Sequence, residues 1–477
     1  MLGNLSTAVG VCETVQRTGN NVPFFDYRTG GGTRSKGVAV TVKAKRYLEV
    51  FEMLFVGLGF MFFSNALEDI GMPSAILSMS RYFLALVSLI FVLLRYKSLH
   101  FKFKRNIALF LVIFLVTMSF TWSGIGPETL FVVRSQFLPM TAFGLYLAAS
   151  FNTRDLVLKL SFVAAFFVLL NYMLVFGMPS VGVDQRVFVG AWTGIHTHKN
   201  GASAYSLISA LLFIIMARRP SPVKWFGLSR QRCFSFLSVL AFIFVLKTTS
   251  GTGTALALFL IATLAIYPRF KWRGRKTILL LDLVAMVLLV VGVAVFGYWE
   301  EILTSMGKDP TLTGRTVFWG ISIEALFKEN PFLGFGRGAF WTQTSSYSQA
   351  IDYYFRGAYN VPHAHNGFLE IALDVGLIGF GFFVLNIFTT LRRALKQAYL
   401  PIDPVNLFPL GYTIIFLVNN MTESLTSNLY TMFWPLYIAV SLNAGLPSNW
   451  MITPRKKSSP EYDPLDPMPR PSFPQSS

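Results

Sequence analysis

The sequence is poor in charged residues, in acidic residues above all, and in cysteine. Only 13% of its 477 residues are charged, and 23 Asp and Glu stand against 41 Lys and Arg. Soluble domains carry about 25% charged residues, so this shortage argues against a soluble globular protein. With only Cys12 and Cys233 the chain has no basis for a disulfide framework, and no Cys/His spacing is typical of a zinc site.

Long uncharged apolar runs are abundant instead. Hydrophobic residues make up 53% of the chain, and its mean hydropathy is +0.53. Because a helix needs about 20 apolar residues to cross a bilayer, these runs predict an all-α polytopic membrane protein with about 12 transmembrane helices. The predicted spans are 47–67, 75–95, 106–122, 130–150, 156–177, 200–217, 233–249, 254–268, 277–298, 367–390, 406–420 and 427–445.

The basic residues predict the orientation of these spans, since Lys and Arg are enriched in cytoplasmic loops. All but ten of the 41 lie in the terminal segments or in connections on one side of a twelve-span chain. Both termini are therefore predicted to be cytoplasmic. The net charge of +18 then reflects topology and contact with anionic inner-leaflet lipid, not nucleic-acid binding. The ten outward basic residues are Arg81, Arg134, Arg186, Lys199, Lys247, Lys308, Arg315, Lys328, Arg337 and Arg356.

Two tails and one large loop complete the predicted organisation. Residues 1–46 and the Pro-rich 447–477 are predicted flexible cytoplasmic tails on either side of a membrane domain, 47–446. Residues 299–366 form the largest outward segment, a predicted periplasmic loop containing short helices. Its aromatic content is typical of an ordered loop that lies over the membrane surface as a lid.

Within that loop, GRTVFWGISIEALFKEN (Gly314 to Asn330) has helical periodicity. Phe318, Ile321, Ala325 and Leu326 fall on one face, and the following Asn-Pro ends the pattern. We predict a helix here, followed by a Gly-rich turn at PFLGFGRGAFW.

The stretch PHAHNGFLEIALDVGLIG places two histidines and an asparagine at the entrance of the span at 367–390. His365 and Asn366 precede Gly376 and Gly379 with the spacing HN-x9-G-x2-G, and the glycines are predicted to permit close helix packing. With TLTGRTVFWG, NPFLGFGRGAFW and GIHTHKNG elsewhere in the chain, this pattern resembles the O-antigen ligase and Wzy-type polysaccharide polymerase family, particularly ExoQ-like exopolysaccharide polymerases. The resemblance extends from about Arg186 to Gly379.

The resemblance implies a glycosyltransferase-C-like (GT-C-like) membrane fold. It also implies inverting, metal-independent transfer of glycans carried on undecaprenyl diphosphate, at the periplasmic face of the bacterial inner membrane. No cofactor is implied. The implied catalytic residue is His365, and Arg315 is the implied diphosphate-binding arginine. Partners would be the lipid-linked oligosaccharide, the bilayer, and chain-length regulator and export proteins.

The chemistry of these residue types agrees with that implication. A histidine with an unperturbed pKa of roughly 6.5 can take a proton from an attacking sugar hydroxyl near neutral pH. Arginine binds phosphate oxygens in pairs and can replace a divalent metal, and no Asp-x-Asp motif occurs in the outward loops. The full set of predicted substrate-binding residues is Arg315, Arg186, Lys199, Asn200, His198, Asn366, Arg134 and Lys247.

One stretch departs from the family pattern. Many ligases of this family carry a further arginine in a run like S/T-R-G/T-A-L, whereas the comparable run here is KTTSGTGTALALFL. Lys247, or Arg186 and Arg134, would have to supply that charge. The departure favours a polymerase over a ligase, because polymerases vary more at this point.

Simpler interpretations of the same residues stay open. His365 could be a loop histidine at a helix start, Arg315 could pair with Glu324 or Glu329, and His198 to Asn200 could anchor a span at the headgroups. For function, the alternatives to a polymerase are a ligase that transfers glycan to lipid A-core, a transporter or flippase of the lipid-linked glycan, and a membrane anchor or sensor. A transporter would show broken spans or inverted repeats with charged midplane sites, whereas no clear repeat is present and the charges are predicted at the outer face.

Overall fold

The computed structural model describes residues 36–447 except 70, 197, 226, 267–313, 355–360, 400–402 and 425–430. The predicted span at 277–298 and most of both predicted tails therefore lie outside the described residues. The fold divides after Glu52 into two compact units, and the candidate site belongs to the second, which begins at Met53.

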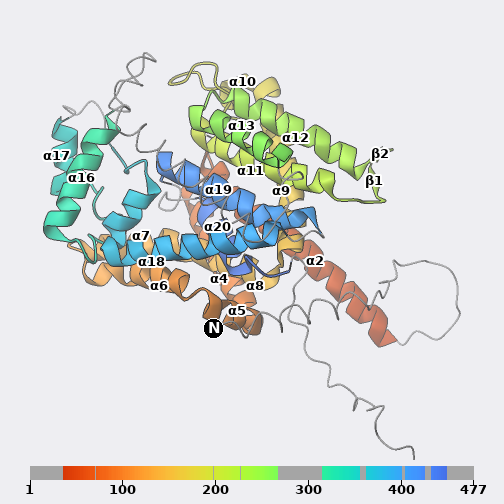
Figure 1. The fold of residues 1–477 in the computed structure, drawn as a ribbon, viewed down its shortest axis with the longest axis horizontal. Helices are drawn as coiled ribbons and strands as arrows, with labels where there is room; N and C mark the ends of the chain where they lie inside the picture. Colours follow the sequence, from red (N-terminus) through yellow and green to blue (C-terminus); the bar gives the residue numbers. More distant parts are fainter. Residues whose placement is uncertain are drawn as a thin grey trace, which may run out of the picture. The chain divides into compact units, whose positions relative to one another are not determined.

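The helices follow the apolar runs of the sequence closely, and their ends coincide with the predicted span limits within a few residues in most cases. In the first half of the chain (Figure 1) they are α2 (Lys36–Phe63), α3 (Ala66–Asp69), α4 (Ser74–Leu94), α5 (Tyr96–Arg105), α6 (Ile107–Met118), η1 (Ser119–Thr121), α7 (Gly126–Val132), η2 (Val133–Phe137), α8 (Leu138–Ser150), α9 (Thr153–Gly177) and α10 (Pro179–Gly182).

The second half adds one small hairpin to an otherwise helical fold. Strands β1 (Lys224–Trp225) and β2 (Leu228–Ser229) pair antiparallel. The helices are α11 (Lys199–Arg218), α12 (Arg230–Lys247), α13 (Gly251–Ile266), α16 (Arg315–Glu329), α17 (Ser346–Tyr354), α18 (Gly367–Ala398), η4 (Pro404–Leu407), α19 (Phe408–Thr422) and α20 (Phe433–Asn443). The predicted helix at Gly314 to Asn330 is confirmed as α16, with Phe318, Ala325 and Leu326 buried.

Five helical segments in the described part of the chain are long and apolar enough to cross a membrane. They are α4, the continuous segment Gly126–Ser150, α9, α11 and α18. A sixth arises if α5 and the segment Ile107–Thr121, which meet at 101°, form one broken span. The chain is thus a multi-pass helical membrane protein, and the total of twelve spans stays a prediction.

Helix α18 is broken near its beginning. Val375 and Gly376 leave helical geometry, Gly376 with φ 66° and ψ −171°, a region that only glycine occupies readily. The expectation that Gly376 serves helix packing is therefore wrong. A Cβ here would lie 2.2 Å from the backbone of Phe332, so glycine is required for the close approach of the Gly-rich loop.

The Gly-rich loop, residues 331–338, supplies the hydrogen bonds that the broken helix lacks. Leu377 and Ile378 donate their N–H groups to the carbonyls of Pro331 and Phe332, at 2.8 and 3.3 Å. In return, the N–H groups of Phe335 and Gly336 donate to the carbonyls of residues 373 and 374. Since buried backbone N–H and C=O groups need partners, loop and helix form one structural element.

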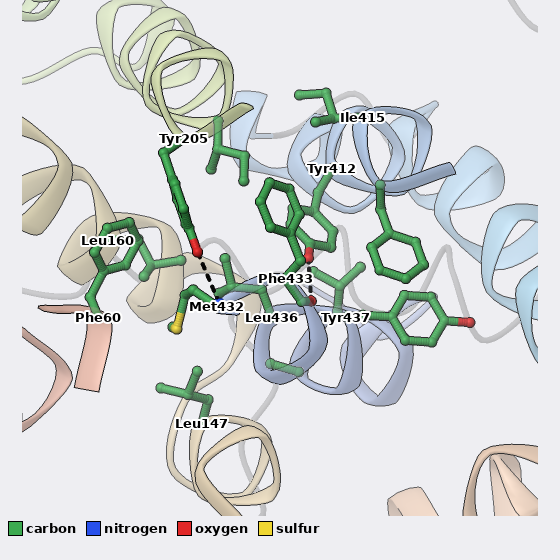
Figure 2. Packing of buried hydrophobic residues seen from close by; sticks show 14 of the residues in the cluster. Phe60, Leu147, Leu160, Tyr205, Tyr412, Ile415, Met432, Phe433, Leu436 and Tyr437 are labelled. Atoms are coloured by element: carbon green, nitrogen blue, oxygen red, sulfur yellow. Dashed lines mark hydrogen bonds between the residues drawn. The ribbon is translucent and has the colours of Figure 1, made fainter. Parts of the chain in front are cut away.

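The start of α20 is held by two tyrosines from neighbouring helices. Figure 2 shows Tyr205 of α11 and Tyr412 of α19 pointing toward the residues that begin α20. The Met432 N–H donates to Tyr205 Oη at 3.1 Å, and Tyr412 Oη donates to the Phe433 carbonyl at 2.6 Å. These bonds fix Phe433 where it lines a cavity at the ends of several helices.

Candidate functional site

A cavity of about 600 Å³ lies where the beginnings of α11 and α18, the end of α19 and the Gly-rich loop meet. This is a common size for a small-ligand site. Four of the five histidines in the chain line it: His196, His198, His363 and His365. The sequence motifs GIHTHKNG and PHAHNG, which lie far apart along the chain, are thus brought to one place.

His365 is paired with a glutamate that the motif does not contain. Its Nδ1 lies 3.2 Å from Oε2 of Glu423, the residue that follows α19, and both side chains are mostly buried. An ionised carboxylate can only accept a hydrogen bond, so Nδ1 must carry the proton. This leaves Nε2 unprotonated in the neutral ring, which is the state of a general base.

Glu423 joins three of the predicted site residues. Besides His365, it accepts a hydrogen bond from Asn200 Nδ2 at 2.7 Å and lies 3.8 Å from Arg315 Nη2. Burial raises the pKa of the Glu423 carboxyl, but hydrogen bonds from His365 and Asn200 and the charge of Arg315 outweigh burial and lower this pKa below its ordinary value. Glu423 is therefore a carboxylate at neutral pH.

The backbone at His365 is held in an unusual conformation. Its φ is +49°, in the left-handed region that non-glycine residues enter rarely, and such residues cluster at functional sites. His363 Nδ1 accepts the His365 N–H at 3.2 Å, and Trp319 of α16 donates to the carbonyl of Ala364 at 2.7 Å. Burial and the neighbouring His365 lower the pKa of His363 to about 3, so His363 stays neutral and supports this turn.

Asn366 is the N-cap of α18. Its Oδ1 accepts from the N–H groups of Phe368 and Leu369, and its own N–H donates to Ser424 Oγ at 3.2 Å. Capping an N-terminus in this way typically contributes about 1 kcal/mol. Asn366 does not line the cavity, so its part in the HN motif is to fix the direction of α18 directly after His365.

Two acidic residues one turn apart on α18 also line the cavity. Glu370 accepts hydrogen bonds from the Ala364 N–H, from Ser424 Oγ at 3.3 Å and from Trp341 Nε1 at 3.1 Å. Asp374 pairs with Arg337 of the Gly-rich loop, with Asp374 Oδ2 and Arg337 Nη1 2.7 Å apart and both side chains almost fully buried. These contacts attach the loop to the N-terminal part of α18, next to His365.

The structure brings four of the predicted site residues together. His365, His198 and Asn200 line the cavity, and Arg315 reaches it through Glu423. Arg315 also donates to the Thr422 carbonyl at 2.8 Å. The alternative that Arg315 pairs with Glu324 or Glu329 does not hold, because Glu324 pairs with Lys328 and Glu329 accepts from Tyr347.

The other predicted cationic residues lie apart from the cavity lining. Lys199 Nζ sits 3.7 Å from the centre of the Phe188 ring, and Arg186 is exposed in the same loop. Lys247 is exposed at the end of α12, 6.0 Å from the Trp192 ring centre. Arg134 is exposed beside Phe131, although Val132 and Gln136 of the same segment do line the cavity. These four stay predictions as diphosphate ligands.

Sequence reasoning missed several residues of the site. Glu423, Glu370, Asp374 and His196 were not singled out, and Arg337 was noted only as an outward basic residue without an explanation. A signal existed for Glu370 and Asp374, since two acids one turn apart in an apolar span mark function by default. Within the described ranges, no three His, Cys, Asp or Glu side chains are arranged to bind a metal ion.

Residues 236–384 match the model of a protein family described as O-antigen ligase. The match covers less than a third of the chain, so it shows a similarity of this segment to the O-antigen ligase family. A stretch of 99 residues is 36% identical to the exopolysaccharide production protein ExoQ of Rhizobium meliloti (strain 1021) and covers 20% of this chain. It covers 22% of ExoQ, so the chain matches about a fifth of the length of this curated relative.

The segment that matches the family model contains much of the site but not all of it. Arg315, Arg337 and His365 lie inside residues 236–384, whereas Asn200 and Glu423 lie outside. The expected resemblance to the O-antigen ligase and ExoQ-like family is confirmed. The similarity covers part of the chain, and the helices of the described part are those of a multi-pass membrane protein.

Proposed function

We propose that this protein is a membrane glycosyltransferase that polymerises undecaprenyl-diphosphate-linked oligosaccharide repeat units into an exopolysaccharide or O-polysaccharide. The observation that carries the proposal is the His365–Glu423 pair, at the edge of a cavity and beside Arg315. A base held by a carboxylate and an adjacent guanidinium are the two groups that transfer from a lipid diphosphate requires.

His365 acts as the base on the acceptor. Its Nε2 takes the proton of the attacking sugar hydroxyl as that oxygen forms a bond to the anomeric carbon of the donor. The bond from this carbon to the diphosphate oxygen breaks, and the diphosphate leaves with the electron pair. Glu423 keeps Nδ1 protonated and stabilises the imidazolium that forms, because the two atoms are 3.2 Å apart.

Arg315 stabilises the negative charge that develops on the leaving diphosphate. Its fork of N–H donors stays charged, and only part of it is occupied by the Thr422 carbonyl. The contact of 3.8 Å to Glu423 is longer than a normal hydrogen bond, so a phosphate oxygen can compete for Nη2. Lys199, Arg186, Arg134 and Lys247 complete the predicted set of cations around the lipid diphosphate.

A polymerase is preferred over a ligase that transfers glycan to lipid A-core. The run KTTSGTGTALALFL lacks the arginine of many ligases, and the relative that matches part of the chain is named an exopolysaccharide production protein. The enzyme would lie in the bacterial inner membrane with both termini cytoplasmic and the cavity open to the periplasm. Chain-length regulator and export proteins would be its partners.

The test is a reaction of the purified protein with lipid-linked repeat units of its source strain, resolved on a gel. The wild type should make a ladder, and His365→Asn should make none. Asparagine tolerates the left-handed φ of this position, so loss of activity would not come from backbone strain. The control is His100→Asn, an exposed histidine away from the cavity, which should make the full ladder.

The outcomes separate the rival functions. A ladder made by His365→Asn would contradict the proposal for this residue. A wild type that makes no ladder but transfers finished glycan to an added lipid A-core acceptor would be a ligase. If no product forms with either acceptor, movement of the labelled lipid across liposome membranes tests the transporter alternative.

A further inference from the structure

The charges that line the cavity differ from those expected of a diphosphate site. Four acidic residues, Glu68, Glu370, Asp374 and Glu423, line it, against Arg337 as the one lining arginine among the described residues. Arg337 is already neutralised by Asp374 at 2.7 Å. Glu423 is likewise paired with Arg315. An anion placed inside would therefore meet the carboxylates of Asp374 and Glu423, whose cationic partners are already occupied, and the exposed Glu68, and like charges placed together oppose binding.

The cavity therefore suits the sugar of a donor or acceptor better than it suits the diphosphate. Arg315 contacts Glu423 but does not itself line the cavity, so the anionic part of a donor fits at this edge. Carboxylates accept hydrogen bonds from hydroxyl groups, and Trp341, fixed through Nε1 by Glu370, gives the cavity wall an aromatic side chain. These groups suit an uncharged molecule rich in hydroxyls.

Gln136 provides an independent indication of a ligand. It belongs to the π-helical segment η2, a feature often found at functional sites, and it lines the cavity while only 7% exposed. Its Oε1 accepts no hydrogen bond from the part of the chain that the structure describes. A buried amide oxygen without a donor is costly, so a donor brought by a ligand would stabilise it.

We propose that this cavity is the acceptor subsite and that Gln136 binds a hydroxyl of the acceptor sugar. The carboxylates would select a terminal sugar that carries no carboxylate or phosphate near this position. That the bound sugar is the acceptor rests on the proposed function. The preference for an uncharged sugar follows from the residues that line the cavity.

The test measures binding without chemistry. The probes are the repeat-unit oligosaccharide of the source strain, released from its lipid, and the same oligosaccharide with the primary hydroxyl of its terminal sugar oxidised to a carboxylate. Binding is followed by the tryptophan fluorescence of the full-length protein in lipid nanodiscs. The wild type should bind the neutral probe at least roughly tenfold more tightly than the oxidised one.

Three variants and one control locate the residues that cause the selectivity. Gln136→Met conserves volume and should weaken binding of the neutral probe roughly tenfold, since it removes one hydrogen bond to the sugar. Gln136→Glu keeps an acceptor oxygen, so it should bind the neutral probe as tightly as the wild type. Its added charge should weaken binding of the oxidised probe further. Glu68→Gln, at an exposed lining position, should narrow the difference between the probes. The same Gln→Met change at exposed Gln349 should alter neither constant.

Three results would overturn the proposal: equal or tighter binding of the oxidised probe, no binding of the neutral probe, or wild-type binding by Gln136→Met. Failure of the proposed function can be distinguished from failure of the subsite, because every binding measurement is repeated in the His365→Asn background. A protein that binds the neutral probe but makes no ladder contradicts polymerisation and leaves the subsite in place.

Discussion

Glu423 lies 58 residues beyond His365 in the chain, yet its Oε2 is 3.2 Å from His365 Nδ1. The two residues come from different elements, one before α18 and one after α19. The packing of these helices therefore determines the tautomer of the histidine. A motif that ends at HN describes only one half of this pair.

Replacing Glu423 tests this relationship. Glu423→Gln keeps the size of the side chain but removes the charge that stabilises the imidazolium, so turnover should fall roughly 100-fold with little change in KM. Initial rates of ladder formation provide the measurement. Glu324→Gln, an exposed glutamate on α16 paired with Lys328, is the matched control and should behave as wild type. Turnover within twofold of wild type for Glu423→Gln would refute the role.

Arg315→Lys should weaken the binding of the lipid-linked donor more than the binding of the acceptor. Lysine keeps the charge but loses the planar fork, including the bond to the Thr422 carbonyl, so kcat/KM for the lipid-linked donor should fall roughly tenfold or more. Lys328→Arg on the same helix, exposed and away from the cavity, serves as the control. If Arg315→Lys changes binding of the released oligosaccharide instead, the residue acts on the sugar and not on the diphosphate.

The break in α18 predicts a large difference between two neighbouring glycines. Gly376→Ala should destabilise the protein by roughly 3 kcal/mol or more, because the side chain meets the Phe332 backbone at a positive φ. Gly381→Ala, with open space around its Cβ position, should be neutral or slightly stabilising. Thermal unfolding in detergent micelles compares the two. Equal melting temperatures would show that the loop is not held as described.

The buried Arg337–Asp374 pair should be sensitive to the loss of one partner. Asp374→Asn removes the carboxylate and should cost roughly 3–5 kcal/mol of stability. Replacing both residues by apolar ones, Arg337→Met with Asp374→Leu, should recover a large part of that loss. A double variant whose loss equals the sum of the single losses would show that the two side chains do not interact.

His196 predicts how stability depends on pH. Burial lowers the pKa of His196 to about 4, against a backbone hydrogen bond with Ser64 that raises it. Below about pH 6.5, His196 binds a proton in the unfolded chain but stays neutral in the folded chain. Stability should therefore fall as pH drops from about 6.5 to about 4, by roughly 3 kcal/mol from this residue. His363, whose pKa is lowered to about 3, adds in the same direction.

Melting temperatures measured across that range would check the effect. His196→Gln cannot take up the proton, so its melting temperature should depend less steeply on pH than that of the wild type. His100→Asn, at an exposed position, should reproduce the wild-type slope. An unchanged slope for His196→Gln would mean that other groups cause the acid sensitivity.

The helices were predictable because crossing a bilayer imposes length and apolarity on the sequence itself. α9 and α11 begin and end within three residues of the predicted spans. The break at Gly376 was not predictable, because both its cause and its hydrogen-bond partners lie in the separate loop at 331–338. Hydrophobic periodicity and hydropathy describe one segment at a time, so they do not predict a contact between two segments.

The site shows the same division. His365, Arg315 and Asn200 were predicted from local motifs, and Glu423 connects all three. Glu423 itself stands alone between two apolar runs, with no motif around it, and only the packing of α19 against α18 reveals it. Arg134 was singled out because it is charged, but the neighbouring uncharged Gln136 is the residue that lines the cavity.

The hydrogen bonds between the Gly-rich loop and α18 also have a consequence for how this protein assembles. The segment from Gly367 to the break is far too short to cross a bilayer alone, and the backbone groups around the break bond to a loop that is synthesised before it. Docking of the loop and placement of His365 are thus a single assembly event. Under the proposed function, a newly made chain would acquire its base only once residues 331–338 are packed against α18, so folding of this loop and activity would be acquired together.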